Sequence, residues 1–164
     1  MLPRISGPER PPRLSPLELS RRVDEALAAT VRDGERVLCL VPDGTRTFDL
    51  PFFFRRIADA LAGKGGDGAP RAAKLDFMVA LGTHPPLDRR AMERLFGLRP
   101  GELASAFAGI GLLNHDWRSP GSLARVGAIP AAEMEALSGG RLSLELPVTI
   151  DAAATAHDID LALE

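Results

Sequence analysis

Short apolar segments alternate along this chain with segments whose apolar residues recur near helical spacing, and this alternation limits the fold more than any other feature. The apolar segments are residues 36–41, 74–81 and 110–116. The first segment, Arg-Val-Leu-Cys-Leu-Val, has no polar alternation, which is typical of a strand covered on both faces in a parallel sheet. Strands that alternate with helices predict an α/β fold with an open, mostly parallel, Rossmann-like sheet flanked by helices.

Local signals predict where the helices begin and end. Ser15, Pro16 and Glu18 have the arrangement of a capping box, and the helix that they begin is expected to end at Gly34. Three shorter helices are predicted further along the chain, over residues 87–97, 101–109 and 130–140. Gly97 is expected to end the first of these three, because glycine adopts the left-handed conformation that often follows a helix.

Another helix is predicted between the first two apolar segments, beginning at Asp49 and Pro51 and followed by a glycine-rich loop. Its apolar residues recur near helical spacing, and those expected to face the core are Phe52, Phe53, Ile57, Ala60 and Leu61. The run of three phenylalanines, residues 52–54, is better explained by core packing than by a surface on which a ligand stacks.

Composition narrows the class of protein. The 164 residues suffice for one domain with a hydrophobic core, expected over residues 15–164, while the proline- and arginine-rich residues 1–14 are expected to form a flexible arm. The net charge of −2 argues against nucleic acid or an anionic membrane as a partner, and no segment approaches the about 20 apolar residues of a membrane span. Cys39 is the only cysteine and is expected to be buried. A soluble, cytoplasmic protein is therefore predicted.

Polar residues follow each of the three predicted strands. In an open α/β sheet, ligands bind beyond the carboxyl ends of the strands, so these residues are expected to lie on one rim of the sheet. The main candidates are Asp43, Thr45, Arg46 and His84, and the secondary candidates are Asn114, His115 and Asp116. Their convergence is the main indication of function that the residues themselves provide.

These residue types suit chemistry on a small acid. Arginine offers a planar set of donors for a carboxylate or phosphate, and histidine exchanges a proton near neutral pH. Asp43 could orient either Arg46 or His84. Each residue also has a purely structural explanation: Asp43 and Thr45 could stabilise the turn, Arg46 could be an ordinary surface residue, and His84 could be a structural histidine. Considered together, the residues favour a small-molecule site.

The segment Asp43-Gly44-Thr45-Arg46-Thr47 also resembles a motif of haloacid-dehalogenase-like phosphatases. Those enzymes carry a nucleophilic aspartate two positions before the second aspartate of the motif, and this chain has Val41 there. Covalent catalysis cannot proceed without the nucleophile, so this interpretation is not the leading one.

A larger part of the chain resembles the N-terminal part of the lactate racemase family. The resemblance rests on three segments in order: DGTR at 43–46, ALGTHPPL at 80–87 and NHDWRSP at 114–120. It begins near residue 36 and runs to the C-terminus, where GAIP, SGGRL and PVTI also look like segments of the family. Each motif is short, and the match gains its specificity from their order and spacing.

The resemblance implies a racemase or epimerase of a small 2-hydroxy acid that uses a nickel-pincer nucleotide, a pyridinium mononucleotide carrying nickel. It implies that His84 takes the proton of the substrate hydroxyl while a hydride passes to the cofactor, and that Arg46 binds the substrate carboxylate. It further implies a role in positioning the cofactor for Asp43, Thr45, Gly82 and Thr83. Pro85 and Thr47 depart from the pattern of many members, which have arginine and proline there, and this leaves the identity of the hydroxy acid open.

The family's second acid/base histidine, its cofactor-tethering lysine segment and its nickel-binding histidine lie beyond the part that this chain resembles. The last residues, 156–164, look like the start of the strand before those elements. The expectation is therefore a chain that stops within the catalytic domain, has no metal site of its own, does not retain the cofactor and is inactive alone. An exposed sheet edge would favour self-association into a homo-oligomer.

Two other functions are alternatives to that of a racemase. The first is a non-catalytic module that binds a small anion or nucleotide through Arg46. The second is a degenerate phosphatase-like fold, which would bind phosphate in a Mg²⁺-dependent manner at Asp43.

Overall fold

The computed structural model of the chain describes the following residues: 14–64, 69–115, 117–119 and 121–152. Of the predicted arm, only Leu14 belongs to this part, and it is exposed. No helix in these ranges is long and apolar enough to cross a membrane.

Three strands form a parallel sheet in which the order in space follows the order in sequence: β1 (Arg36–Pro42), β2 (Lys74–Ala80) and β3 (Gly111–Asn114). The central strand β2 is buried along five consecutive residues, as expected for a strand covered on both faces. All three carboxyl ends lie at the same edge of the sheet because the strands are parallel. The predicted open, parallel α/β architecture is confirmed.

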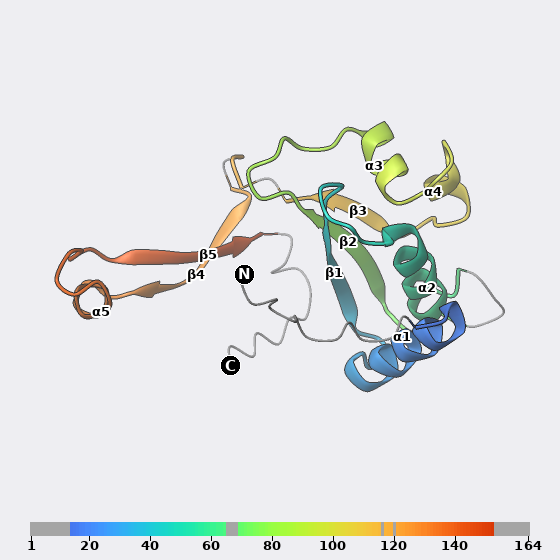
Figure 1. Cartoon of the computed structure of the whole chain (residues 1–164), viewed down its shortest axis with the longest axis horizontal. Helices are drawn as coiled ribbons and strands as arrows, with labels where there is room; N and C mark the ends of the chain where they lie inside the picture. Colours follow the sequence, from blue (N-terminus) through green and yellow to red (C-terminus); the bar gives the residue numbers. More distant parts are fainter. Residues whose placement is uncertain (1–13, 65–68, 116, 120, 153–164) are drawn as a thin grey trace, which may run out of the picture.

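Four helices lie to one side of this sheet (Figure 1): α1 (Pro16–Thr30), α2 (Leu50–Ala62), α3 (Arg89–Leu95) and α4 (Glu102–Ser105). The connections from β1 to β2 and from β2 to β3 cross the sheet in the same direction, and right-handed crossovers then place their helices on the same face. Helix α4 is a single turn, shorter than the helix predicted over residues 101–109.

The predicted helix starts are present. At α1, the backbone N–H of Glu18 donates to the Ser15 hydroxyl, and the backbone N–H of Ser15 donates to the Glu18 carboxylate at 2.9 Å, which completes the capping box. Asp49 caps α2 by accepting from the backbone N–H of Phe52. Helix α1 ends at Thr30, before the predicted end at Gly34.

Phe54 is the centre of the core, and the predicted core face of α2 is wrong in detail. The ring of Phe54 is fully buried and packs against three other phenylalanines, Phe77, Phe96 and Phe107, with centroids 5.0, 5.2 and 4.8 Å away. The buried residues of α2 are Leu50, Phe54, Ala58 and Leu61, whereas Phe52, Phe53, Ile57 and Ala60 are only partly buried. Successive helical residues are rotated by about 100°, so one of three adjacent phenylalanines can point to the centre.

Strand β1 is not covered on both faces, contrary to the prediction from its apolar sequence. Val41 is buried on the side of the helices, but Leu40 is 69 % exposed. Successive strand residues point to opposite faces of a sheet, and the four helices lie on the side of Val41, so Leu40 points away from them. Cys39, expected to be buried, is partly buried and packs against the core, and this burial raises the pKa of its thiol to about 12.

The chain after β3 forms a second, antiparallel sheet: β4 (Leu123–Ile129) and β5 (Leu146–Asp151), joined by a segment that contains α5 (Ala131–Leu137). This hairpin extends away from the parallel sheet (Figure 1). The sequence analysis did not predict β4, whose alanines, arginine and glycine are weak strand formers. Helix α5 lies within the segment for which a helix was predicted.

Candidate functional site

The side chains of Asp43 and His84 meet at the carboxyl ends of β1 and β2. Asp43 follows the last residue of β1, and His84 lies in the turn after β2. Oδ2 of Asp43 accepts a hydrogen bond from Nδ1 of His84, because an ionised carboxylate can only accept. A neutral imidazole held in this way has Nε2 as the ring nitrogen that can take up a proton. The structure thus brings two of the main candidates into direct contact.

Thr45 engages the other oxygen of the same carboxylate. Its hydroxyl donates to Oδ1 of Asp43 at 2.6 Å, and its backbone N–H donates to the same oxygen at 3.1 Å. This is the local turn-stabilising role that aspartate and threonine often have. Asp43 therefore stabilises its own turn with one oxygen and orients His84 with the other.

The environment of Asp43 favours its ionised form. Its side chain is 10 % exposed, whereas that of His84 is 52 % exposed. The hydrogen bond from the Thr45 hydroxyl, followed by the bond with His84, lowers the pKa of Asp43 to about 2. A carboxylate that stays charged can hold the imidazole and stabilise it when it becomes an imidazolium.

Arg46 lies on the surface beside this pair. Its backbone N–H donates to the carbonyl of Asp43 at 3.3 Å. Within the described ranges, its guanidinium makes no hydrogen bond or ion pair, and its side chain is exposed. An arginine with no partner is available to bind an anion.

Gly82 and Thr83 contribute backbone to the turn that carries His84. Gly82 has φ +57°, a left-handed conformation that favours glycine, and the backbone N–H of His84 donates to the carbonyl of Leu81 at 3.0 Å. The carbonyls of Gly82 and Thr83 each accept a side-chain hydrogen bond from the segment after β3. These two residues therefore shape the turn through their backbone.

The three secondary candidates, Asn114, His115 and Asp116, differ in what the structure shows of them. The Asn114 amide makes two hydrogen bonds with the backbone of Leu87, accepting from its N–H at 3.0 Å and donating to its carbonyl at 2.9 Å. The backbone N–H of His115 donates to the carbonyl of Val79, and its side chain is partly buried. Asp116 lies outside the described residues. Asn114 thus holds the loop after His84 in place, a role that its sequence position did not reveal.

A hollow of about 500 Å³ lies against the Asp43–His84 pair. Its walls come from the turn at Asp43 and Thr45, the turn from His84 to Leu87, and the beginning of α3. Arg46 is not among the lining residues, although it belongs to the turn that forms one wall. The volume suits a small organic molecule.

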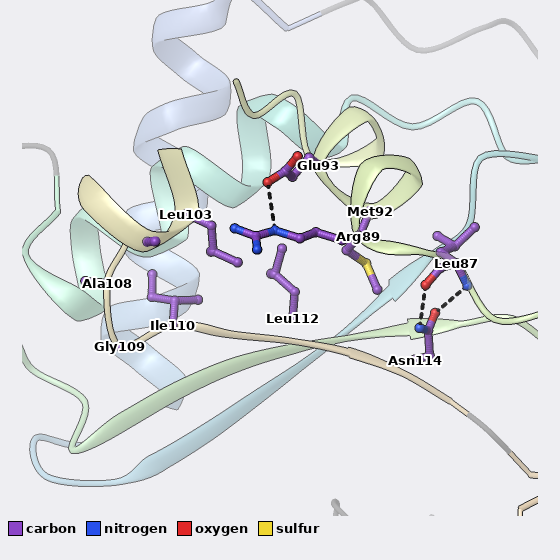
Figure 2. A pocket seen from close by; sticks show the side chains of 11 residues that line it. Leu87, Arg89, Met92, Glu93, Leu103, Ala108, Gly109, Ile110, Leu112 and Asn114 are labelled. Atoms are coloured by element: carbon purple, nitrogen blue, oxygen red, sulfur yellow. Dashed lines mark hydrogen bonds and ion pairs between the residues drawn. The ribbon is translucent and has the colours of Figure 1, made fainter. Parts of the chain in front are cut away.

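A second hollow of about 530 Å³ lies between β3, α3 and α4 (Figure 2). Its lining is mainly apolar, with Met92 and Leu112 among the contributors, and Arg89 and Glu93 form an ion pair of 3.4 Å beside it. Leu87 lines both hollows. The sequence analysis did not identify this second hollow, because its walls come from three separate elements whose approach no local pattern indicates.

Metal-binding side chains are not clustered in the described ranges: no group of three or more His, Cys, Asp or Glu residues there could hold a metal ion.

Comparisons with known proteins show similarity at the level of the fold. No protein-family model and no curated protein sequence matches the chain. A crystal structure of a Thermotoga maritima protein matches 85% of this chain and 30% of its own, with a TM-score of 0.65 and 21% identity. The structure of the lactate racemase apoprotein from Thermoanaerobacterium thermosaccharolyticum matches the same shares, with a TM-score of 0.49 and 18% identity. The chain thus spans about a third of the length of these two proteins.

The depressed pKa of Asp43 leads to a prediction for acid solution. Because the pKa in the folded protein is about 2 rather than 3.8, the Asp43 contacts are expected to add full stability above pH 4 and to lose it as the pH falls through about 2. A ¹³C-carboxyl NMR titration of the wild-type chain would measure this pKa. The Thr45→Val variant should raise it, because the Thr45 hydroxyl is the main cause of the shift. A wild-type Asp43 that titrates near 3.8 would contradict the prediction.

Proposed function

We propose that this chain contributes one acid/base and one carboxylate-binding residue to the active site of a 2-hydroxy acid racemase or epimerase. The observation that carries the proposal is the Asp43–His84 pair, which presents an oriented imidazole at the wall of a hollow of about 500 Å³. The resemblance of segments 43–46, 80–87 and 114–120 to the lactate racemase family supports the same chemistry.

His84 is the proposed acid/base. Its Nδ1 is engaged by Asp43, so Nε2 is the atom that takes the proton from the C2 hydroxyl of the substrate and returns it to the product. When Nε2 is protonated, the imidazolium lies next to an ionised carboxylate, which stabilises the new charge. Asp43 therefore keeps the ring in the correct tautomer and favours the proton transfer.

Arg46 is the proposed binding residue for the substrate carboxylate. Arginine and carboxylate can form two parallel hydrogen bonds, which fix the orientation of the C2 hydroxyl relative to the imidazole. The guanidinium of Arg46 has no competing partner in the described part of the chain, so no bond has to break before the substrate binds.

The proposed cofactor is the nickel-pincer nucleotide that the family resemblance implies. The described residues do not fit the metal, because they contain no group of side chains that could hold it. The nickel ligands of the proposed enzyme would therefore belong to residues outside the described ranges.

The phosphatase-like alternative is less well supported by the geometry. Asp43 would have to coordinate Mg²⁺, but Oδ1 already accepts from Thr45 and Oδ2 from His84. Of the about four lone-pair sites of the carboxylate, these three hydrogen bonds leave one for a metal ion.

Lactate binding is the test of the proposed function. The isotope-labelled chain would be titrated with D- and L-lactate while the imidazole signals of His84 are followed by NMR. Lactate is expected to shift these signals, and Arg46→Ala is expected to weaken binding about 10- to 100-fold, as for the loss of a charge-assisted hydrogen bond. Arg125→Ala is the matched control, because it removes an exposed arginine of the hairpin and should leave the affinity unchanged.

Four outcomes would contradict the proposal. Lactate that leaves His84 unperturbed, or binding that is insensitive to Arg46→Ala, removes its basis. Inorganic phosphate that binds through Arg46 in preference to lactate, without an effect on His84, indicates the anion-binding module. Calorimetry that shows coupled binding of Mg²⁺ and phosphate indicates the phosphatase-like alternative.

A further inference from the structure

The position of His84 depends on a turn that packing alone does not hold. His84 lies outside the regular elements, after β2 has ended at Ala80, and its side chain is 52 % exposed. The turn bends at Gly82, which has a positive φ. An exposed residue in an irregular turn is mobile unless hydrogen bonds restrain the backbone around it.

Two consecutive side chains supply such restraints from the segment after β3. The indole Nε1 of Trp117 donates to the carbonyl of Gly82 at 2.6 Å, and Nη2 of Arg118 donates to the carbonyl of Thr83 at 3.1 Å. The two carbonyls immediately precede His84 in the chain, so the two bonds restrain the backbone directly before the imidazole.

The surroundings of Trp117 suit a role in this contact better than a role in the core. Trp117 is the only tryptophan of the chain and is 41 % exposed, so it adds little to the core. The guanidinium of Arg118 lies 5.0 Å from the centre of its ring, a cation–π arrangement that joins the two donor side chains.

The end of the same turn, at Leu87, is held by a side chain other than Trp117 and Arg118. Figure 2 shows the Asn114 amide in its two hydrogen bonds with the backbone of Leu87. The turn from Leu81 to Leu87 is thus fixed by Trp117 and Arg118 before His84 and by Asn114 after Pro86. All three side chains belong to β3 or to the segment that follows it.

We propose that Trp117 and Arg118 are positioning residues that hold the His84 turn by its carbonyls, so that Nδ1 of His84 meets Asp43 and Nε2 faces the hollow. The importance of this role rests on the proposed function of His84, but the contact itself does not. Trp117 and Arg118, which follow β3, therefore act on the site through the turn that follows β2. They do not need to touch the substrate.

The tautomer of His84 tests the proposal directly. Long-range ¹H–¹⁵N NMR of the intact chain, at a pH where the imidazole is neutral, reports whether Nδ1 or Nε2 carries the proton, and His84→Gln assigns the signals. The wild-type chain is expected to hold the proton on Nδ1, as the bond to Asp43 requires. Trp117→Phe and Arg118→Gln each remove a donor, and the ratio of Nδ1–H to Nε2–H is expected to fall about tenfold, the effect of losing one hydrogen bond.

Arg125→Gln is the matched control, since Arg125 also donates to a backbone carbonyl, that of Gly127 in the hairpin, and its loss should not change the ratio. An unchanged ratio in both Trp117→Phe and Arg118→Gln overturns the proposal. If Trp117→Phe does not yield a folded chain, an unchanged ratio in Arg118→Gln alone overturns the proposal. If the variants change the tautomer ratio but the chain does not bind lactate, the positioning role is supported and the proposed function is contradicted. The two tests can therefore give different outcomes.

Discussion

Replacing Phe54 by alanine is expected to lower the free energy of unfolding by about 3–5 kcal/mol. The ring is fully buried, and it packs against Phe77 on β2, against Phe96 after α3 and against Phe107. Its removal would leave a cavity at the point where the helices meet the sheet, and three aromatic neighbours cannot all collapse into it.

Urea denaturation followed by circular dichroism would measure this loss. Phe52→Ala is the matched control, because it removes the same side chain from the same helix at a partly buried position. We expect its effect to be no more than about half that of Phe54→Ala. Equal effects for the two variants would show that Phe54 is not the centre of the core.

Gly97→Ala is expected to destabilise the chain by about 2–5 kcal/mol, through two causes that add. Gly97 follows α3 with φ +63°, and a residue other than glycine there costs about 1–2 kcal/mol. A Cβ at this position would also lie 2.8 Å from Cβ and 2.9 Å from Cγ of Pro51. The rigid ring of Pro51, in the first turn of α2, cannot move aside without shifting the helix, so overpacking adds about 1–3 kcal/mol.

Gly139→Ala separates the two causes in a thermal or urea denaturation experiment. Gly139 follows the seven-residue helix α5 just as Gly97 follows the seven-residue helix α3, and its φ is +62°. A Cβ at Gly139 would meet no atom within 4 Å. Only the conformational cost should appear there, and a loss as large as that of Gly97→Ala would refute the role of Pro51.

The helix boundaries show how much of the fold could be predicted from sequence. The capping box of Ser15 and Glu18 and the cap of Asp49 were all predicted, because each contact joins residues three positions apart. Helix α4 was predicted too long, and the strand β4 was not predicted. The residues of α4 are good helix formers and those of β4 are weak strand formers, so intrinsic preference set neither the length of α4 nor the presence of β4, and tertiary context decided both.

The site could be predicted in part. That polar residues after parallel strands would share one rim follows from topology, and Asp43 and His84 do meet there. The contacts of Trp117 and Arg118 with the His84 turn join residues 35 positions apart, and those of Asn114 with Leu87 join residues 27 apart. Nothing in a local pattern indicates such a partner, so the supporting roles of these residues were not predicted, although Asn114 was named as a secondary candidate.

The sequence by itself determined the succession of the helices and of the three strands in the parallel sheet, the main helix caps, and the set of residues from which a site could be built. It did so because these features depend on periodicity and on contacts within one helical turn. Three outcomes were decided by the tertiary structure alone. It places Phe54 and not its neighbours at the centre of the core, brings Pro51 against Gly97, and brings Trp117 and Arg118 to the turn of His84. These outcomes depend on how separate elements pack, and only the folded chain brings the partners together.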